Sequence, residues 1–166
     1  MITTSNENLI TEMINYFSDD PKRIQHFIKV YEFAKLIGTL ENLDRDIMKI
    51  LEVAAIVHDI GIKPAEEKFG SSSGKLQEQE GPNAAKILLK SLGYDGKLID
   101  RVCYLIAHHH TYDSITETDY QILVEADFLV NMYEDNLSKE SIKSVYTKIF
   151  KTKTGKKICS EMYQIN

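Results

Sequence analysis

The chain has 166 residues, 43% of them hydrophobic and 27% charged, which fits one globular domain with a substantial core. Its net charge of −5 argues against a nucleic-acid partner, although a substrate pocket can still be locally positive. Because the sequence shows no secretion signal, no long apolar run and only two cysteines without a CxxC pair, we expect a reduced, cytoplasmic setting with no disulfide framework and no membrane partner.

Apolar residues recur at intervals of three and four along most of the chain, and no segment alternates with a period of two. This pattern predicts an all-α fold, a single-domain bundle of about seven or eight helices over residues 1–166. Asp20 before Pro21 is a typical N-cap, and Gly38 is placed to end the second helix. The expected helices, in chain order, cover about 6–17, 21–37, 44–58, 82–92, 96–109, 117–134 and 139–149, with a short one after Gly155.

The segment 61–83 is the one long stretch without a clear helical pattern. It is rich in charged residues and contains the runs FGSSSG and QEQEGP. Loops of this length in compact domains often act as lids or binding loops, and are otherwise mobile. We expect an irregular loop here, and the sequence leaves its role open.

An apolar run, Val53–Val57, brings a histidine and an aspartate side by side to the turn at Gly61. Burying an imidazole next to a carboxylate is costly unless something binds them, and a divalent metal commonly does so. Alternatively, His58 only stabilises a helix end and Asp59 caps the next turn. We expect His58 and Asp59 to form the centre of a metal site.

Four more residues could supply ligands from other helices. His26 lies on an apolar stripe, so its ring is predicted to point inward, and a core histidine without a metal is the alternative. His109 continues the apolar stripe of its own helix, and His110 can turn inward where that helix ends. His108 lies off the stripe. For this run the alternative is a solvated helix end, favoured by the helix dipole.

Asp127 lies on an apolar face of its helix, with apolar residues four positions before and three after it. A carboxylate in such a place needs a cation or strong donors. A core aspartate that is bonded to the backbone or to a histidine is the alternative. Glu125 is expected to point elsewhere, toward the surface or toward a ligand that it supports.

The order H…HD…D over about residues 20–135 resembles the HD superfamily of metal-dependent phosphohydrolases. The flanking residues support this resemblance, because Ala-Ala-Ile-Val precedes the HD pair, Ile-Gly follows it, and Glu-Ala-Asp contains the last position. The resemblance implies a helical bundle of the HD-domain type, with further C-terminal helices at 136–166. It also implies that the metal is held by His26, His58, Asp59 and Asp127.

Some branches of this family hold a second metal, through an earlier histidine and a His-His pair on the following helix. In this sequence His109 and His110 resemble that pair, but Gln77 occupies the position of the earlier histidine. Glu80 or Glu78 could replace that histidine, and the His-His pair could otherwise contact phosphate. The resemblance therefore implies one divalent ion per chain, or two if a carboxylate substitutes.

Two imidazoles and two carboxylates suit Mn, Fe, Co, Ni, Zn or Mg better than a thiolate-seeking metal. Such an ion lowers the pKa of a bound water and stabilises charge growing on phosphorus. We expect a hydrolase of a small phosphate ester or nucleotide, with Asp59 and His58 as its catalytic residues. Lys63 and Lys75 are candidate phosphate contacts, and the alternative for each is a solvated surface lysine.

Two other functions stay open. Some relatives with the HD fold oxidise their substrates at a di-iron site with six or more ligands, and the absence of a histidine at Gln77 argues against this oxygenase reading. The other alternative is a sensor of nucleotides or other small ligands with a structural metal. Iron content, oxygen uptake and binding without turnover distinguish these two from a hydrolase.

Overall fold

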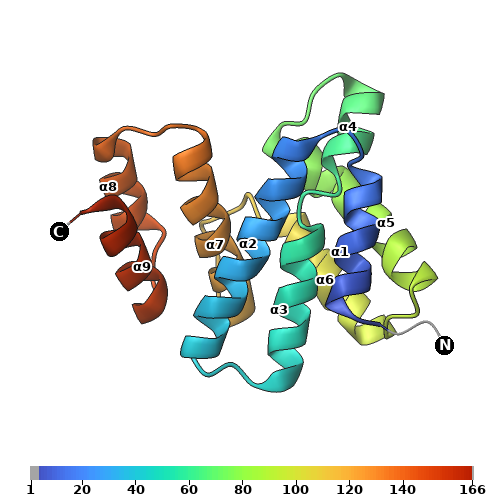
Figure 1. The fold of residues 1–166 in the computed structure, drawn as a ribbon, viewed down its shortest axis with the longest axis horizontal. Helices are drawn as coiled ribbons and strands as arrows, with labels where there is room; N and C mark the ends of the chain where they lie inside the picture. The colour runs from blue at the N-terminus through green and yellow to red at the C-terminus, as the bar shows by residue number, and fades with distance from the viewer. Residues whose placement is uncertain (1–3, 166) are drawn as a thin grey trace.

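The computed structural model describes residues 4–165 and has nine helices and no strand within them (Figure 1). The predicted all-α bundle is therefore confirmed, with one helix more than expected. No helix in this part of the chain is both long and apolar enough to cross a membrane. The helices are α1 (Asn6–Tyr16), α2 (Pro21–Leu40), α3 (Arg45–Val57), α4 (Ile62–Phe69), α5 (Gly74–Ser91), α6 (Gly96–His108), α7 (Thr118–Glu134), α8 (Lys139–Lys148) and α9 (Lys153–Tyr163).

Three helices form the middle of the bundle. α2 packs against both α3 and α7, and α3 also contacts α7, α6 and α1. Figure 1 shows α8 and α9 together at one end of the molecule, beyond α7, and α4 and α5 toward the other end. α2 is central because it buries residues on two of its sides.

Segment 61–83 is the part of the chain where the sequence prediction was wrong. Two helices, α4 and the first half of α5, replace the expected loop, and only residues 70–73 between them are irregular. Gly70 ends α4 in the left-handed conformation, with φ of 65°. α5 then continues through Pro82, because its inward residues Gly81, Ala85 and Leu89 pack against neighbouring helices.

The helix ends differ from the prediction in two more places. The Asp20 side chain caps α2 as expected, accepting from the Arg23 N–H at 3.1 Å. α2 does not end at Gly38 but continues to Leu40, and a Cβ at Gly38 would meet the Met48 sulfur at 2.6 Å. Gly38 is therefore a close packing point between α2 and α3. α9 begins before Gly155 instead of after it.

The turn after the HD pair is held by a close backbone crossing. A Cβ at Gly61 would lie 2.6 Å from the Gln77 carbonyl oxygen and 2.7 Å from the Gly81 nitrogen. Both are backbone atoms of α5, so they cannot move aside as a flexible side chain can. Gly61 therefore allows α5 to cross directly over the end of the HD turn.

We predict that Gly61→Ala destabilises the protein by about 1 to 3 kcal/mol, the usual cost of overpacking. Gly81→Ala is the matched control, because a Cβ there would meet its nearest neighbour, Ile106 Cδ1, at 3.7 Å. Replacing a glycine inside a helix by alanine adds up to about 1 kcal/mol of stability. Urea unfolding of both variants measures the difference, and equal stabilities would contradict the crossing.

Candidate metal centre

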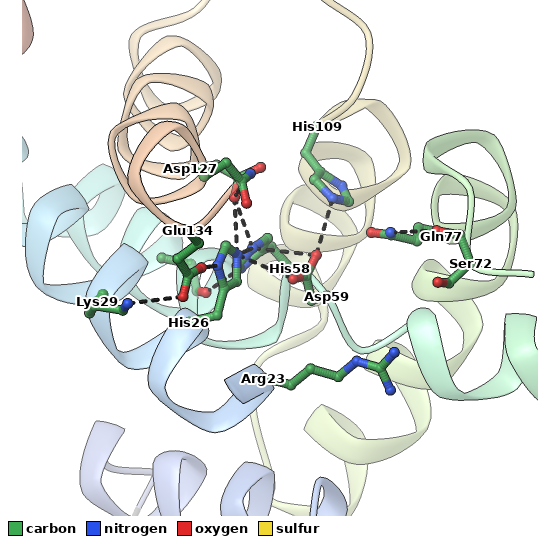
Figure 2. A network of polar contacts seen from close by, with 12 residues as sticks. Arg23, His26, Lys29, His58, Asp59, Ser72, Gln77, His109, Asp127 and Glu134 are labelled. Atoms are coloured by element: carbon green, nitrogen blue, oxygen red, sulfur yellow. Dashed lines mark hydrogen bonds and ion pairs between the residues drawn. The ribbon is translucent and has the colours of Figure 1, made fainter. Parts of the chain in front are cut away.

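Four side chains that the sequence singled out meet in the middle of the bundle (Figure 2). His26 comes from α2, His58 and Asp59 follow the last residue of α3, and Asp127 comes from α7. The His26 Nε2 atom lies 3.2 Å from His58 Nε2, 3.1 Å from Asp127 Oδ1 and 3.3 Å from Asp59 Oδ2. His58 Nε2 lies 3.4 Å from Asp59 Oδ1. We call these four residues the ligand cluster.

The histidine rings are fixed so that each Nε2 faces the cluster. His58 and His109 each place Nδ1 2.7 Å from the carbonyl oxygen three residues earlier. Because a carbonyl can only accept, Nδ1 carries the hydrogen and, in the neutral ring, Nε2 keeps its lone pair. His26 Nδ1 is held by Glu134, which also accepts from Lys29 at 2.9 Å. Metal-binding histidines in proteins are oriented in the same way.

His109 adds a third imidazole to this arrangement. Its Nε2 is buried and has no hydrogen-bond partner among the described residues. It lies 3.6 Å from Asp59 Oδ1, and Figure 2 shows the ring facing that carboxylate. Buried polar atoms in proteins are almost always paired, so this one points to a missing partner.

The pKa values of the cluster indicate that a positive charge is favoured at its centre. Burial lowers the pKa of His26, but the hydrogen bond with Asp127 and the charge of Asp59 outweigh it and raise this pKa to about 9. Burial alone would raise the pKa of Asp59, yet His58 and its other neighbours lower it to about 2. Without a metal, protons must therefore separate the converging nitrogens and oxygens.

The donor set fits a divalent cation. Imidazole nitrogens and carboxylate oxygens that converge from three elements are the ligands that such ions prefer, and His26, His58 and Asp59 present atoms within 4.8 Å of one another. A cation would take the place of the protons, since metal binding to histidine releases them.

Three residues predicted to take part are not brought to the cluster. The ammonium of Lys63 donates to the Tyr16 carbonyl oxygen at 3.1 Å, and Lys75 is exposed. Glu80 pairs with Lys68 at 2.7 Å. None of the three lines the pocket beside the cluster. His108 also lies outside it, as expected.

Glu125 is buried, which corrects the expectation of a surface or supporting group. It points away from the cluster and accepts hydrogen bonds from Gln121 at 2.9 Å and from the Thr152 hydroxyl at 2.8 Å. Thr152 caps α9, so this carboxylate attaches the C-terminal helix to α7. Gly155 is required there, because a Cβ would collide with Glu125.

A polar pocket of about 460 Å³ opens over the cluster. Asp59 keeps 13% of its side chain exposed, and it lines the pocket. Arg23 and Gln77, which sequence reasoning did not assign to substrate, lie in its wall. The full lining is Asp20, Lys22, Arg23, His26, Asp59, Ile62, Ser72, Gln77, His110, Asp127, Asn131, Glu134 and Asp135. A larger hollow of about 950 Å³ lies elsewhere, among the ends of α1, α2 and α3, and contains none of the cluster.

Two of the missed residues had a usable signal in the sequence. Arg23 precedes His26 by three positions, so both lie on one face of α2. Glu134 follows Asp127 by seven positions, which is two helical turns. Gln77 had no such signal, because its contact with the site depends on how α5 crosses the HD turn.

A family model for the HD domain matches residues 23–151. The chain belongs to the HD domain family. Among solved structures, this HD domain is similar to a predicted HD superfamily hydrolase from an uncultured Thermotogales bacterium. The two are 28% identical, the match covers 95% of this chain and 84% of the other, and the TM-score is 0.68. No curated protein matches the sequence. The resemblance inferred from H…HD…D is thereby confirmed.

We predict that a divalent metal stabilises this HD domain. At an ion concentration one hundred times Kd, binding adds about 2.7 kcal/mol, which raises Tm by roughly 5 to 10 °C for a domain of this size. Asp127→Asn should abolish the rise, and Asp113→Asn, on an exposed loop, should keep it. Thermal unfolding with Mn²⁺ and with EDTA measures both effects. An equal rise in the two variants would contradict the assignment of Asp127.

Proposed function

We propose that this HD domain is a metal-dependent phosphohydrolase that acts on a small phosphate ester or nucleotide. The observation that carries the proposal is the convergence of three imidazole Nε2 atoms and two carboxylates at the base of a polar pocket. Membership of the HD domain family, and the likeness to a predicted hydrolase, support the hydrolytic part.

His26, His58, Asp59 and Asp127 would hold the ion, which when bound supplies a Lewis acid for a phosphate oxygen and a water of lowered pKa. Asp59 also lines the pocket, so its carboxylate can orient the attacking water by accepting a hydrogen bond. The free Nε2 of His109, 3.6 Å from Asp59 Oδ1, can take the proton that the water loses.

Arg23 replaces the two lysines as the proposed phosphate contact. Arg23 lies in the pocket wall, and its guanidinium is oriented by Glu66 on α4 and by Asp20, at 3.1 Å. Figure 2 shows the side chain extending from α2 toward the segment that carries Ser72 and Gln77. Guanidinium groups bind phosphate oxygens in pairs, so a cation placed here can hold the substrate against the metal centre.

Phosphate release tests the proposed function. Purified protein loaded with Mn²⁺ should release inorganic phosphate from at least one member of a panel of sugar phosphates, nucleoside monophosphates and p-nitrophenyl phosphate. Asp59→Asn should lower kcat by roughly 10²- to 10⁴-fold, because the site loses several kcal/mol of transition-state stabilisation. The exposed Asp113→Asn is the control. No release across the panel, or full activity in Asp59→Asn, would contradict the proposal.

We predict that Arg23→Gln lowers kcat/KM, for a substrate from which phosphate is released, by roughly 10- to 100-fold. This loss corresponds to one charge-assisted hydrogen bond, which contributes about 1.5 to 3 kcal/mol. Lys63→Gln removes a nearby positive charge that binds the Tyr16 carbonyl outside the pocket, so its kcat/KM should stay unchanged. Steady-state kinetics on both variants compares the two cations. A larger loss in Lys63→Gln would reverse the assignment.

A further inference from the structure

We propose that this HD domain binds one metal ion per chain, because Gln77 makes His110 a hydrogen-bond donor instead of a metal ligand. A second position for an ion exists in outline. Asp59, His109 and His110 present ligand atoms within 4.8 Å of one another. The directions of the hydrogen bonds around His110 remove it from this set.

The orientation of the Gln77 amide determines whether His110 Nε2 carries a hydrogen. Its Nε2 donates to the Ser72 carbonyl oxygen at 2.8 Å, and a carbonyl oxygen can only accept. The other end of the amide, Oε1, therefore faces His110 Nε2 at 3.0 Å. Since Oε1 can also only accept, His110 Nε2 must carry a hydrogen.

This conclusion does not depend on the charge of the ring. A neutral His110 with its hydrogen on Nε2 and a protonated His110 both donate from Nε2, and neither has a lone pair there. The lone pair that the neutral ring keeps on Nδ1 faces the Tyr112 hydroxyl, 3.4 Å away, which can donate to it. His109 is the opposite case, because its Nδ1 donates to a carbonyl and, when the ring is neutral, its Nε2 keeps the lone pair. Two adjacent histidines thus present opposite tautomers to the same site.

The His110 ring is also held in place by its surroundings. A Cβ at Gly74 would lie 3.0 Å from His110 Cγ, so the first residue of α5 packs directly on the ring. The His109 ring lies on another side, with the centroids 4.0 Å apart. Glu78 accepts from the His110 backbone N–H at 3.3 Å and from the Thr111 hydroxyl at 2.9 Å. The first turns of α5 therefore fix the segment that carries His110.

Without His110, the second ion position has only two ligands, Asp59 and His109. The first ion position has four. Two ligands are too few to retain an ion beside a complete site. A di-iron oxygenase needs both positions filled, so the contacts of Gln77 also argue against that alternative.

Metal counting tests the inference, by mass spectrometry of the protein after saturation with Mn²⁺ and desalting. The unmodified chain should retain one ion, with the six-line EPR spectrum of an isolated Mn²⁺. Gln77→His should retain two, with an exchange-coupled spectrum, because the acceptor that holds His110 is replaced by a ligand. Gln77→Glu is a second variant with the same expectation. Gln79→His, on the exposed side of α5, adds a histidine without touching His110 and should retain one.

Two retained ions in the unmodified chain would overturn the inference, and so would one ion in both Gln77 variants with unchanged melting temperatures. Long-range ¹H–¹⁵N spectra of the metal-free protein give an independent readout. They should show a hydrogen on Nε2 of His110, and an Nδ1–H tautomer at that residue would also overturn the inference. The count needs no substrate, so a protein that binds one ion but releases no phosphate would refute the proposed activity and leave this inference standing.

Discussion

The structure depends on a set of histidine rings whose outer nitrogens are held by hydrogen bonds and whose inner nitrogens face carboxylates. At His58 and His109 a backbone carbonyl fixes the ring, and at His26 the carboxylate of Glu134 does so. The inner nitrogens then approach one another as closely as 3.2 Å. Nitrogens and oxygens this close together favour a positive charge in their middle, and Asp127 and Asp59 raise the pKa of His26 in keeping with a proton there when no metal is bound.

The helices around this centre are placed by a small number of close contacts. Gly61 lets α5 cross over the HD turn, and this crossing brings Gln77 into the pocket wall. α7 carries Asp127 on the face toward the centre and Glu125 on the face toward α9. The C-terminal helices are thus attached to the same helix that carries Asp127, although they contribute no residue to the pocket.

The apolar stripes of the sequence predicted which polar side chains point inward, and the resemblance to the HD superfamily implied that four of them meet. His26 and Asp127 were found in this way, and the adjacent pair His58–Asp59 by its position after a buried helix. The all-α fold followed from periodicity alone. These predictions rest on local spacing, which a helix converts directly into a direction in space.

The rest depended on tertiary contacts that local spacing does not contain. α4 and the first half of α5 are rich in charged residues and bury few apolar side chains, so no apolar stripe marked them as helices. The glycine and serine run between them pointed to a loop. Lys63 was predicted to contact phosphate because it lies shortly after the HD pair in sequence, but its ammonium faces the Tyr16 carbonyl instead. The tautomer of His110 is set by an amide 33 residues away, and no pattern in the sequence reports how that amide is turned.

Anomalous diffraction from crystals soaked in a transition-metal salt tests the central claim most directly. We predict an anomalous peak at bonding distance, roughly 2 Å, from the Nε2 atoms of His26 and His58 and from carboxylate oxygens of Asp59 and Asp127. Crystals that show no peak there at saturating metal, with the four side chains bonded only to one another, would contradict it.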